Sequence, residues 1–176
     1  VLAWPRIQEV LSAELCRPLA ECYLRVSEIP IAAASLSQVH AAELLDGREA
    51  VVKVQYPDIA QVVREDLQSL GGLGMPFQGF QKRGRLDEYS KLIDDTLHEE
   101  LDYKAELASL KRFSSDHFQF PWLSLPQPIE TLCTSKVLTL TRLRGSSFAN
   151  VCKAWSEEHK QTLGKNLLIL FLDSLL

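Results

Sequence analysis

The chain has 176 residues, of which 46% are hydrophobic and 24% are charged, and its formal net charge is -4 at pH 7. This length and apolar content suffice for one compact domain, or for one domain and part of a second. The mildly acidic charge and the lack of a long basic run argue against a nucleic-acid-binding protein. The longest apolar run, Leu167 to Leu172, is far shorter than the ~20 residues that span a bilayer.

The N-terminal part predicts two helices, from about Pro5 to Glu14 and from Arg17 to Tyr23. A loop of small side chains follows them, made of Ala32, Ala33, Ala34 and Ser35. Small side chains let backbone N–H groups approach an anion closely, as in the phosphate loops of kinases, and alanine makes such a loop stiffer than glycine does. The alternative interpretation of an alanine-rich turn is tight packing without a ligand.

The next segment predicts a β-hairpin. Asp46-Gly47 separates two runs that can pair as strands, Ser37 to Leu44 and Glu49 to Gln55. Because side chains alternate along a strand, Val52 and Val54 share one face, whereas Val51, Lys53 and Gln55 share the other. A lysine between valines either reaches solvent or meets an anionic partner. We therefore expect Lys53 to have such a partner or an exposed ammonium group.

A charged helix is the predicted partner of Lys53. After Pro57 the sequence predicts a helix over Asp58–Leu70, a glycine-rich loop to about Gly84, and a second helix over about Leu92–Phe113. In the second helix Asp102 and Glu106 are four residues apart, where like charges cost about 0.2–0.5 kcal/mol. A nearby cation such as Lys53 would relieve this repulsion. The alternative is a solvated charged face.

The rest of the chain predicts a second hairpin and a final helix. A Phe- and Pro-rich crossing from Phe118 to Pro128 leads to strands over Thr131–Thr134 and Lys136–Thr141, and Gly145 ends this region. Ser156, followed by Glu157 and Glu158, is a helix start. Neither the cysteines nor the histidines have metal-ligand spacing, and the cysteines are expected as reduced thiols in a core. They are Cys16, Cys22, Cys133 and Cys152.

Four segments resemble the UbiB, or aarF-domain, family of atypical protein-kinase-like proteins. They are the run Pro-Ile-Ala-Ala-Ala-Ser-x-x-Gln-Val-His starting at Pro30, the run Val-Lys-Val-Gln-Tyr-Pro ending at Pro57, the triplet Glu100-Leu101-Asp102, and the strand from Val137 followed by Gly145. The resemblance implies an α+β fold: a kinase-like small lobe with an antiparallel sheet plus helices, and the first helix of a large lobe. The implied domains are a helical extension over 1–29, the small lobe over 30–145 with a helical insertion at about 57–92, and the start of the large lobe over 146–176.

The resemblance also implies roles for individual residues. Lys53 and Glu106 match the ion pair of the catalytic site. The implied nucleotide-binding residues are Ala32, Ala33, Ala34, Ser35, Val51, Lys53, Leu140 and Leu143, and the implied regulatory motif consists of Glu100, Asp102 and Gln38. Two positions depart from the family pattern. Val51 replaces a small alanine that lies over adenine in the family, and Thr141 stands where an acidic residue is common.

ATP and Mg²⁺ are the cofactors implied by the resemblance, with the Mg²⁺ ligands expected beyond Leu176, since no kinase catalytic loop precedes that residue. The implied activity is that of a kinase or ATPase that supports isoprenoid-quinone (ubiquinone) biosynthesis or lipid metabolism. Lipid or quinone-pathway proteins are the implied partners, and peripheral membrane association of the full-length protein is a further expectation. The implied location is bacterial and membrane-associated, or mitochondrial or plastid. The alternatives are a pseudokinase or partner-binding scaffold, and a purely structural α+β module.

Overall fold

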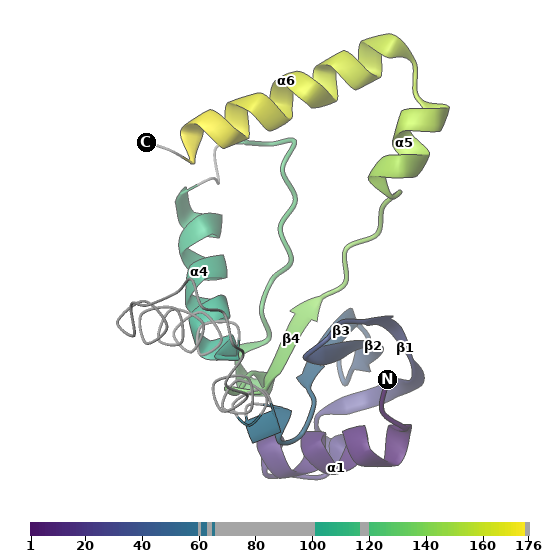
Figure 1. The fold of residues 1–176 in the computed structure, drawn as a ribbon, viewed down its shortest axis with the longest axis vertical. Coiled ribbons are helices and arrows are strands. Elements are labelled where there is room, and N and C mark those ends of the chain that lie inside the picture. Colours follow the sequence, from purple (N-terminus) through teal and green to yellow (C-terminus); the bar gives the residue numbers. More distant parts are fainter. Residues whose placement is uncertain (60, 63–64, 66–100, 117–119, 175–176) are drawn as a thin grey trace, which may run out of the picture. The chain divides into compact units, whose positions relative to one another are not determined.

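A computed structural model of the chain describes residues 1–59, 61–62, 65, 101–116 and 120–174. These residues form two units, Val1–Arg142 and Leu143–Leu176. The first unit contains a four-stranded antiparallel sheet with the order β1-β2-β3-β4 (Figure 1). The predicted α+β class is therefore confirmed. The predicted helical insertion at about 57–92 and the first part of the predicted Leu92–Phe113 helix lie largely outside the described residues.

Helix α1, Trp4–Leu15, packs on one face of the sheet. A proline in its first turn suits the start of a helix, and Ile7, Leu11 and Leu15 recur every four residues, so they lie on one side of it. All three are buried with the inward side chains of the strands. The predicted first helix is confirmed. The predicted second helix is reduced to a single 3₁₀ turn, Leu19–Glu21.

Strand β1, Tyr23–Ala33, is a long edge strand that the sequence did not predict. Its pairing with β2 shifts register three times, between Tyr23 and Arg25, between Val26 and Pro30, and between Pro30 and Ala32. Such bulges destroy the two-residue alternation by which a strand is recognised. The strand also includes Ala32 and Ala33, so the predicted loop of four small residues is shortened to the turn between β1 and β2.

The predicted hairpin is confirmed as strands β2, Ser37–Leu44, and β3, Glu49–Gln55. Gly47 has φ +84°, a conformation that the turn requires and that glycine adopts without strain. Strand β4, Val137–Thr141, pairs with β3. One face of the sheet packs against α1 and is called the α1 face here. Its buried apolar side chains include Ala42, Leu44, Ala50, Val52, Val54 and Val137.

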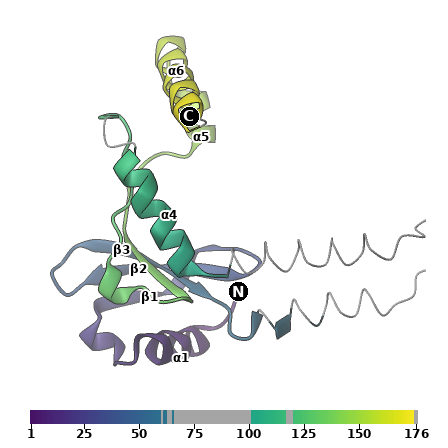
Figure 2. The ribbon, with the colours of Figure 1, turned by 90° about the vertical axis from the view of Figure 1, so that its left-hand side faces the viewer.

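Helix α4, Tyr103–Asp116, lies on the other side of the sheet from α1 (Figure 2). It begins after Asp102, whose Oδ1 accepts a hydrogen bond from the backbone N–H of Lys104 at 2.9 Å. The prediction of one helix running through Leu101 and Asp102 is therefore wrong at this point. Asp102 caps the helix start, so it is not the interior neighbour of Glu106 that the sequence analysis assumed.

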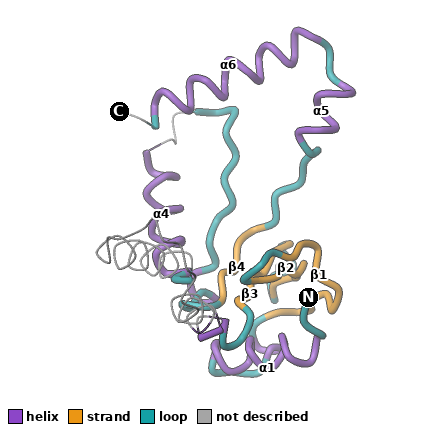
Figure 3. The backbone as a smooth tube through the Cα atoms, in the orientation of Figure 1, coloured by secondary structure: helices purple, strands orange, loops and turns teal. Residues whose placement is uncertain are grey.

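Residues 120–136, which lead into β4, are mainly loop (Figure 3). The predicted strand Thr131–Thr134 is wrong, because Glu130–Leu132 forms a 3₁₀ turn and Cys133 and Thr134 are irregular. The segment that accompanies β4 is the preceding one: the N–H of Thr141 donates to the carbonyl of Gln127 at 2.8 Å, and the N–H of Ile129 donates to the carbonyl of Thr139 at 2.9 Å. The β-branched threonines favoured a strand, but Thr134 instead belongs to the turn into β4, where its N–H donates to the carbonyl of Val137 at 2.8 Å.

The second unit contains helices α5, Phe148–Ala154, and α6, Glu157–Asp173. The sequence predicted the start of α6, where Ser156 accepts a hydrogen bond from the N–H of His159, but it did not predict α5. No helix among the described residues is both long and apolar enough to cross a membrane. All four cysteines are free. Cys16 and Cys152 are exposed, so the prediction that the cysteines lie in a core is wrong for these two residues.

Candidate nucleotide site

Lys53 and Glu106 meet on the face of the sheet opposite to α1. Lys53 Nζ lies 2.7 Å from Glu106 Oε2, so the side chain on β3 and the side chain on α4 form a hydrogen-bonded ion pair. The Lys53 side chain is 31% exposed and that of Glu106 is 43% exposed, which leaves the pair open to an incoming anion. An ammonium group has three N–H donors, so Lys53 can hold Glu106 and still bind an oxygen of a ligand.

The ring of Tyr103 forms the floor under this ammonium group. Lys53 Nζ lies 4.5 Å from the centroid of the Tyr103 ring, within cation–π range. Tyr103 is 2% exposed and is the first residue of α4. Tyr103 was not among the predicted site residues, although it lies between Asp102 and Glu106 in the sequence.

Register across the sheet places Ala32, a predicted site residue, in one row with Lys53. Ala32 pairs with Val39, Val39 pairs with Lys53, and Lys53 pairs with Leu138. Paired residues in antiparallel strands point to the same face, so these four form one row, called the Lys53 row here.

A second row lies next to it. Val51 pairs with Ala41 on one side and with Leu140 on the other, and these three form the Val51 row. The structure thus brings Ala32, Val51, Lys53 and Leu140 onto one face of the sheet in two adjacent rows. The larger Val51 side chain occupies the middle of its row, on the face where the sequence analysis expected adenine.

The turn between β1 and β2 is the remnant of the predicted alanine loop. It consists of Ala34, Ser35 and Leu36. The N–H of Ala34 donates to the carbonyl of Ser37 at 2.8 Å, and the carbonyl of Leu36 accepts from the N–H of Tyr56 at 3.0 Å. Ala33 pairs with Gln38, and Gln38 alternates with Val39 along β2, so this alanine belongs to the α1 face and not to the Lys53 row.

Gln38 belongs to a buried network on the α1 face, away from Lys53. Its Oε1 accepts from the N–H of Leu2 at 2.9 Å, and its amide nitrogen lies 2.8 Å from Nε2 of His40. His40 Nδ1 lies 2.7 Å from the carbonyl of Ser27, so Nδ1 carries the proton and Nε2 accepts from Gln38. Burial lowers the pKa of His40 below its ordinary value of 6.5.

Three other predicted site residues remain. Asp102 caps α4, as described above. Glu100 lies outside the described residues. Leu143 belongs to the second unit and is 50% exposed. Its contact with a nucleotide, and the regulatory motif of Glu100, Asp102 and Gln38, stay predictions.

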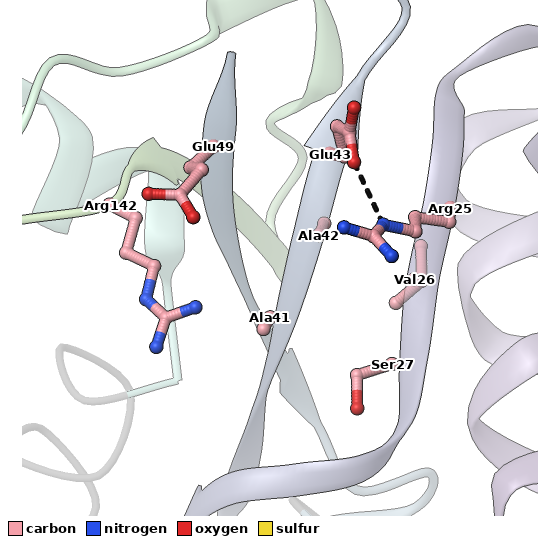
Figure 4. Close-up of a pocket in the computed structure, with 8 residues that line it drawn as sticks. All are labelled: Arg25, Val26, Ser27, Ala41, Ala42, Glu43, Glu49 and Arg142. Carbon is pink, nitrogen blue, oxygen red and sulfur yellow. Dashed lines mark hydrogen bonds and ion pairs between the residues drawn. The ribbon is translucent and has the colours of Figure 1, made fainter. Parts of the chain in front are cut away.

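A cavity of about 290 Å³ lies at the end of the sheet where β4 finishes (Figure 4). Among the described residues its lining includes the ion pair between Arg25 Nε and Glu43 Oε2, at 2.8 Å, and also Glu49 and Arg142. Ala41, from the Val51 row, is part of the same lining. The cavity therefore adjoins the Val51 row, but its charged side chains are not those that the sequence analysis assigned to the nucleotide.

An antiparallel sheet whose third strand presents a lysine to a glutamate on a later helix defines the protein as a kinase-like α+β domain. The chain matches the family model for the ABC1 atypical kinase-like domain over residues 1–176, and it belongs to that family. The suspected family is therefore confirmed.

Several known proteins are similar to the chain. It is 31% identical to the atypical kinase COQ8, mitochondrial, of Saccharomyces cerevisiae over 170 residues, which covers 97% of this chain and 34% of that protein. It is 32% identical to the probable protein kinase UbiB of Marinobacter nauticus over 145 residues, which covers 81% of the chain and 26% of the relative. The chain thus spans about a third or less of the length of these relatives.

A solved structure supports the same fold. The structure of Rv3197 with erythromycin, from Mycobacterium tuberculosis, matches with a TM-score of 0.73 and 29% sequence identity, and the match covers 93% of this chain and 41% of that one. The names of the relatives indicate different compartments. COQ8 of Saccharomyces cerevisiae is named as mitochondrial, whereas ACTIVITY OF BC1 COMPLEX KINASE 7 of Arabidopsis thaliana, which is 34% identical to the chain, is named as chloroplastic.

Proposed function

We propose that this chain is the ATP-binding part of an atypical kinase or ATPase of the UbiB type, with the phosphates of ATP bound at Lys53. One observation carries the proposal: Lys53 and Glu106 pair at 2.7 Å on the face of the sheet that also presents Ala32, Val51 and Leu140. The role in isoprenoid-quinone or lipid metabolism rests on the family resemblance alone.

The residues of the chain fit a bound triphosphate in a definite way. The Lys53 ammonium group would bind phosphate oxygens, while Glu106 and the Tyr103 ring keep this group over the sheet. Val51 and Leu140 would face the base, and the backbone of the Ala34–Leu36 turn would lie near the phosphates. ATP would supply the phosphoryl group that is transferred.

A magnesium ion does not fit the described residues in the same way. Among them no group of three or more His, Cys, Asp or Glu side chains is arranged to hold a metal ion. We therefore assign no Mg²⁺ ligand to the described part of the chain. The domain boundaries at 29/30 and 145/146, with a large lobe beginning at residue 146, are part of the same proposal.

The second candidate function is a pseudokinase or a partner-binding scaffold. The observation that favours it is Val51, whose side chain projects between Ala41 and Leu140 on the face where the base would lie. Added bulk there opposes base binding while leaving the fold intact. This candidate predicts the same structure without nucleotide turnover.

Thermal unfolding at increasing Mg·ATP concentration separates the two functions. The protein to use is the full-length protein that carries this chain, beside Lys53→Ala and Glu106→Gln. A ligand that binds only the folded state stabilises it by about 2.7 kcal/mol at a hundred times its Kd, so the wild-type melting temperature should rise with ATP. The melting temperatures of both variants should rise less with ATP. A wild type with no shift at millimolar Mg·ATP would refute ATP binding and favour the scaffold.

A further inference from the structure

The side chain of Gln55 connects the sheet to the start of α4. It lies two residues after Lys53 on β3, on the same face, and is 4% exposed. Its amide nitrogen donates to the carbonyl of Leu101 at 2.6 Å and to the carbonyl of Ser135 at 3.3 Å. Leu101 precedes the Asp102 cap of α4, and Ser135 belongs to the turn that leads into β4.

Tyr103 makes the second connection at the same place. Its backbone N–H donates to the carbonyl of Ser135 at 3.0 Å, so Gln55 and Tyr103 share one acceptor. Its buried ring lies against Lys53, as described above. Gln55 and Tyr103, with the carbonyls of Leu101 and Ser135, are called the α4 clamp here.

The hydrogen bonds of the clamp are better suited than the ion pair to fix the position of Glu106. A solvent-exposed ion pair such as Lys53–Glu106 adds too little stability to hold a helix in one place, because water and salt screen the two charges. The clamp hydrogen bonds involve a buried amide, which is costly to leave unpaired. Glu106 follows Tyr103 by three residues, so fixing the helix start fixes the Glu106 side chain on the Lys53 side.

We propose that Gln55 and Tyr103 are positioning residues that hold α4 against β3 and keep Glu106 at Lys53 when no nucleotide is bound. This inference rests on the proposed ATP site for its functional meaning, but not for its structural content. It implies that the site is assembled in advance, so that ATP binding is not coupled to an inward movement of the start of α4.

A double-mutant cycle on Mg·ATP affinity tests the functional part, with the full-length protein that carries this chain. Gln55→Leu should weaken ATP binding by about tenfold, as should Glu106→Gln, and the double variant should be no weaker than either one, because both act through the same pair. Lys111→Gln is the matched control, since it breaks an ion pair of the same helix with Glu130, at 2.6 Å, outside the clamp. This control should bind ATP like the wild type. Additive losses in the double variant would overturn the proposal.

Amide hydrogen exchange in the absence of nucleotide tests the structural part. The Tyr103 amide should be protected in the wild type and in Lys111→Gln, and it should exchange rapidly in Gln55→Leu while the β3 amides stay protected. Gln55→Asn, whose amide is one methylene too short to reach Leu101, replaces Gln55→Leu should the latter not fold. Protection of Tyr103 in the Gln55 variants would overturn the clamp. A protected wild type that binds no ATP would refute the proposed function and leave the clamp in place.

Discussion

Three buried polar groups form a series of hydrogen bonds on the α1 face, and the series joins the two edge strands of the sheet. Thr139 Oγ1 on β4 donates to the carbonyl of Leu132 at 2.8 Å. Its single proton is thereby committed, so the Tyr23 hydroxyl on β1, 2.7 Å away, must be the donor to Thr139. Burial raises the pKa of the Tyr23 phenol, which keeps this donor protonated. Both side chains are fully buried, at 2% and 0% exposed.

Because Tyr23 donates to Thr139 and Thr139 donates to Leu132, removing either hydroxyl group should lower the free energy of unfolding by a different amount. Tyr23→Phe removes one hydrogen bond and leaves Thr139 bonded to Leu132, so it should lower the free energy of unfolding by about 1 kcal/mol. Thr139→Val keeps the side-chain shape but leaves the buried Tyr23 hydroxyl without its acceptor, so it should cost about 2–4 kcal/mol. In the double variant the stranded hydroxyl is gone, and its cost should be lower than the sum of the two single costs.

Equilibrium unfolding in urea, with the slope of the transition compared among variants, measures these costs. Thr141→Val on the same strand is the matched control, because its hydroxyl accepts from the N–H of Gln127 at an exposed position, and it should cost about 0.5 kcal/mol or less. A Thr139→Val cost no greater than that of Tyr23→Phe, or strictly additive costs in the double variant, would contradict this order of hydrogen bonds.

Three further outcomes are expected. Burial lowers the pKa of His40 below 6.5, so at acidic pH the unfolded chain binds a proton that the folded chain does not. The free energy of unfolding, measured in urea titrations, should therefore be highest above pH 6.5 and should decrease as the pH falls below that value. His40→Asn should lose this fall, and a wild type with flat stability from about pH 5.5 to 7.5 would contradict it. Gly47→Ala should lower the free energy of unfolding by about 1 kcal/mol in thermal melts, because φ is +84° and no atom lies within 4 Å of an added Cβ. Val51→Ala should bind ATP several-fold more tightly by calorimetry, and equal or weaker binding would refute the steric effect of this side chain.

Local signals predicted the β2–β3 hairpin with its observed bounds. Asp46-Gly47 fixes the turn, and strict alternation over Glu49–Gln55 fixes which face carries Lys53. The contact of Lys53 with Glu106 spans 53 positions, and it was expected only because a buried-strand lysine needs an anion. Physical chemistry thus suggested the partner, while the family resemblance suggested which carboxylate it was.

Other features could not be predicted, for identifiable reasons. Strand β1 contains Pro30 and three register shifts, which remove the alternation that reveals a strand. The α4 clamp depends on Gln55 contacts to residues 46 and 80 positions away, and no local pattern of Gln55 or Tyr103 encodes them. Asp102 carried a usable signal, since aspartate is a preferred helix cap. The continuous apolar spacing on both sides of it concealed the boundary.

Covalent labelling with an acyl-phosphate derivative of ATP tests most directly whether the phosphates meet Lys53. Such a reagent transfers its acyl group to an amine beside the bound phosphates, and mass spectrometry identifies the modified residue. The account predicts that Lys53 of the full-length protein is the labelled lysine, that free ATP suppresses the labelling, and that surface lysines such as Lys136, which pairs with Glu14 at 3.1 Å, are labelled without ATP protection. Labelling of Lys53 that ATP does not suppress, or ATP-protected labelling at another lysine alone, would contradict it.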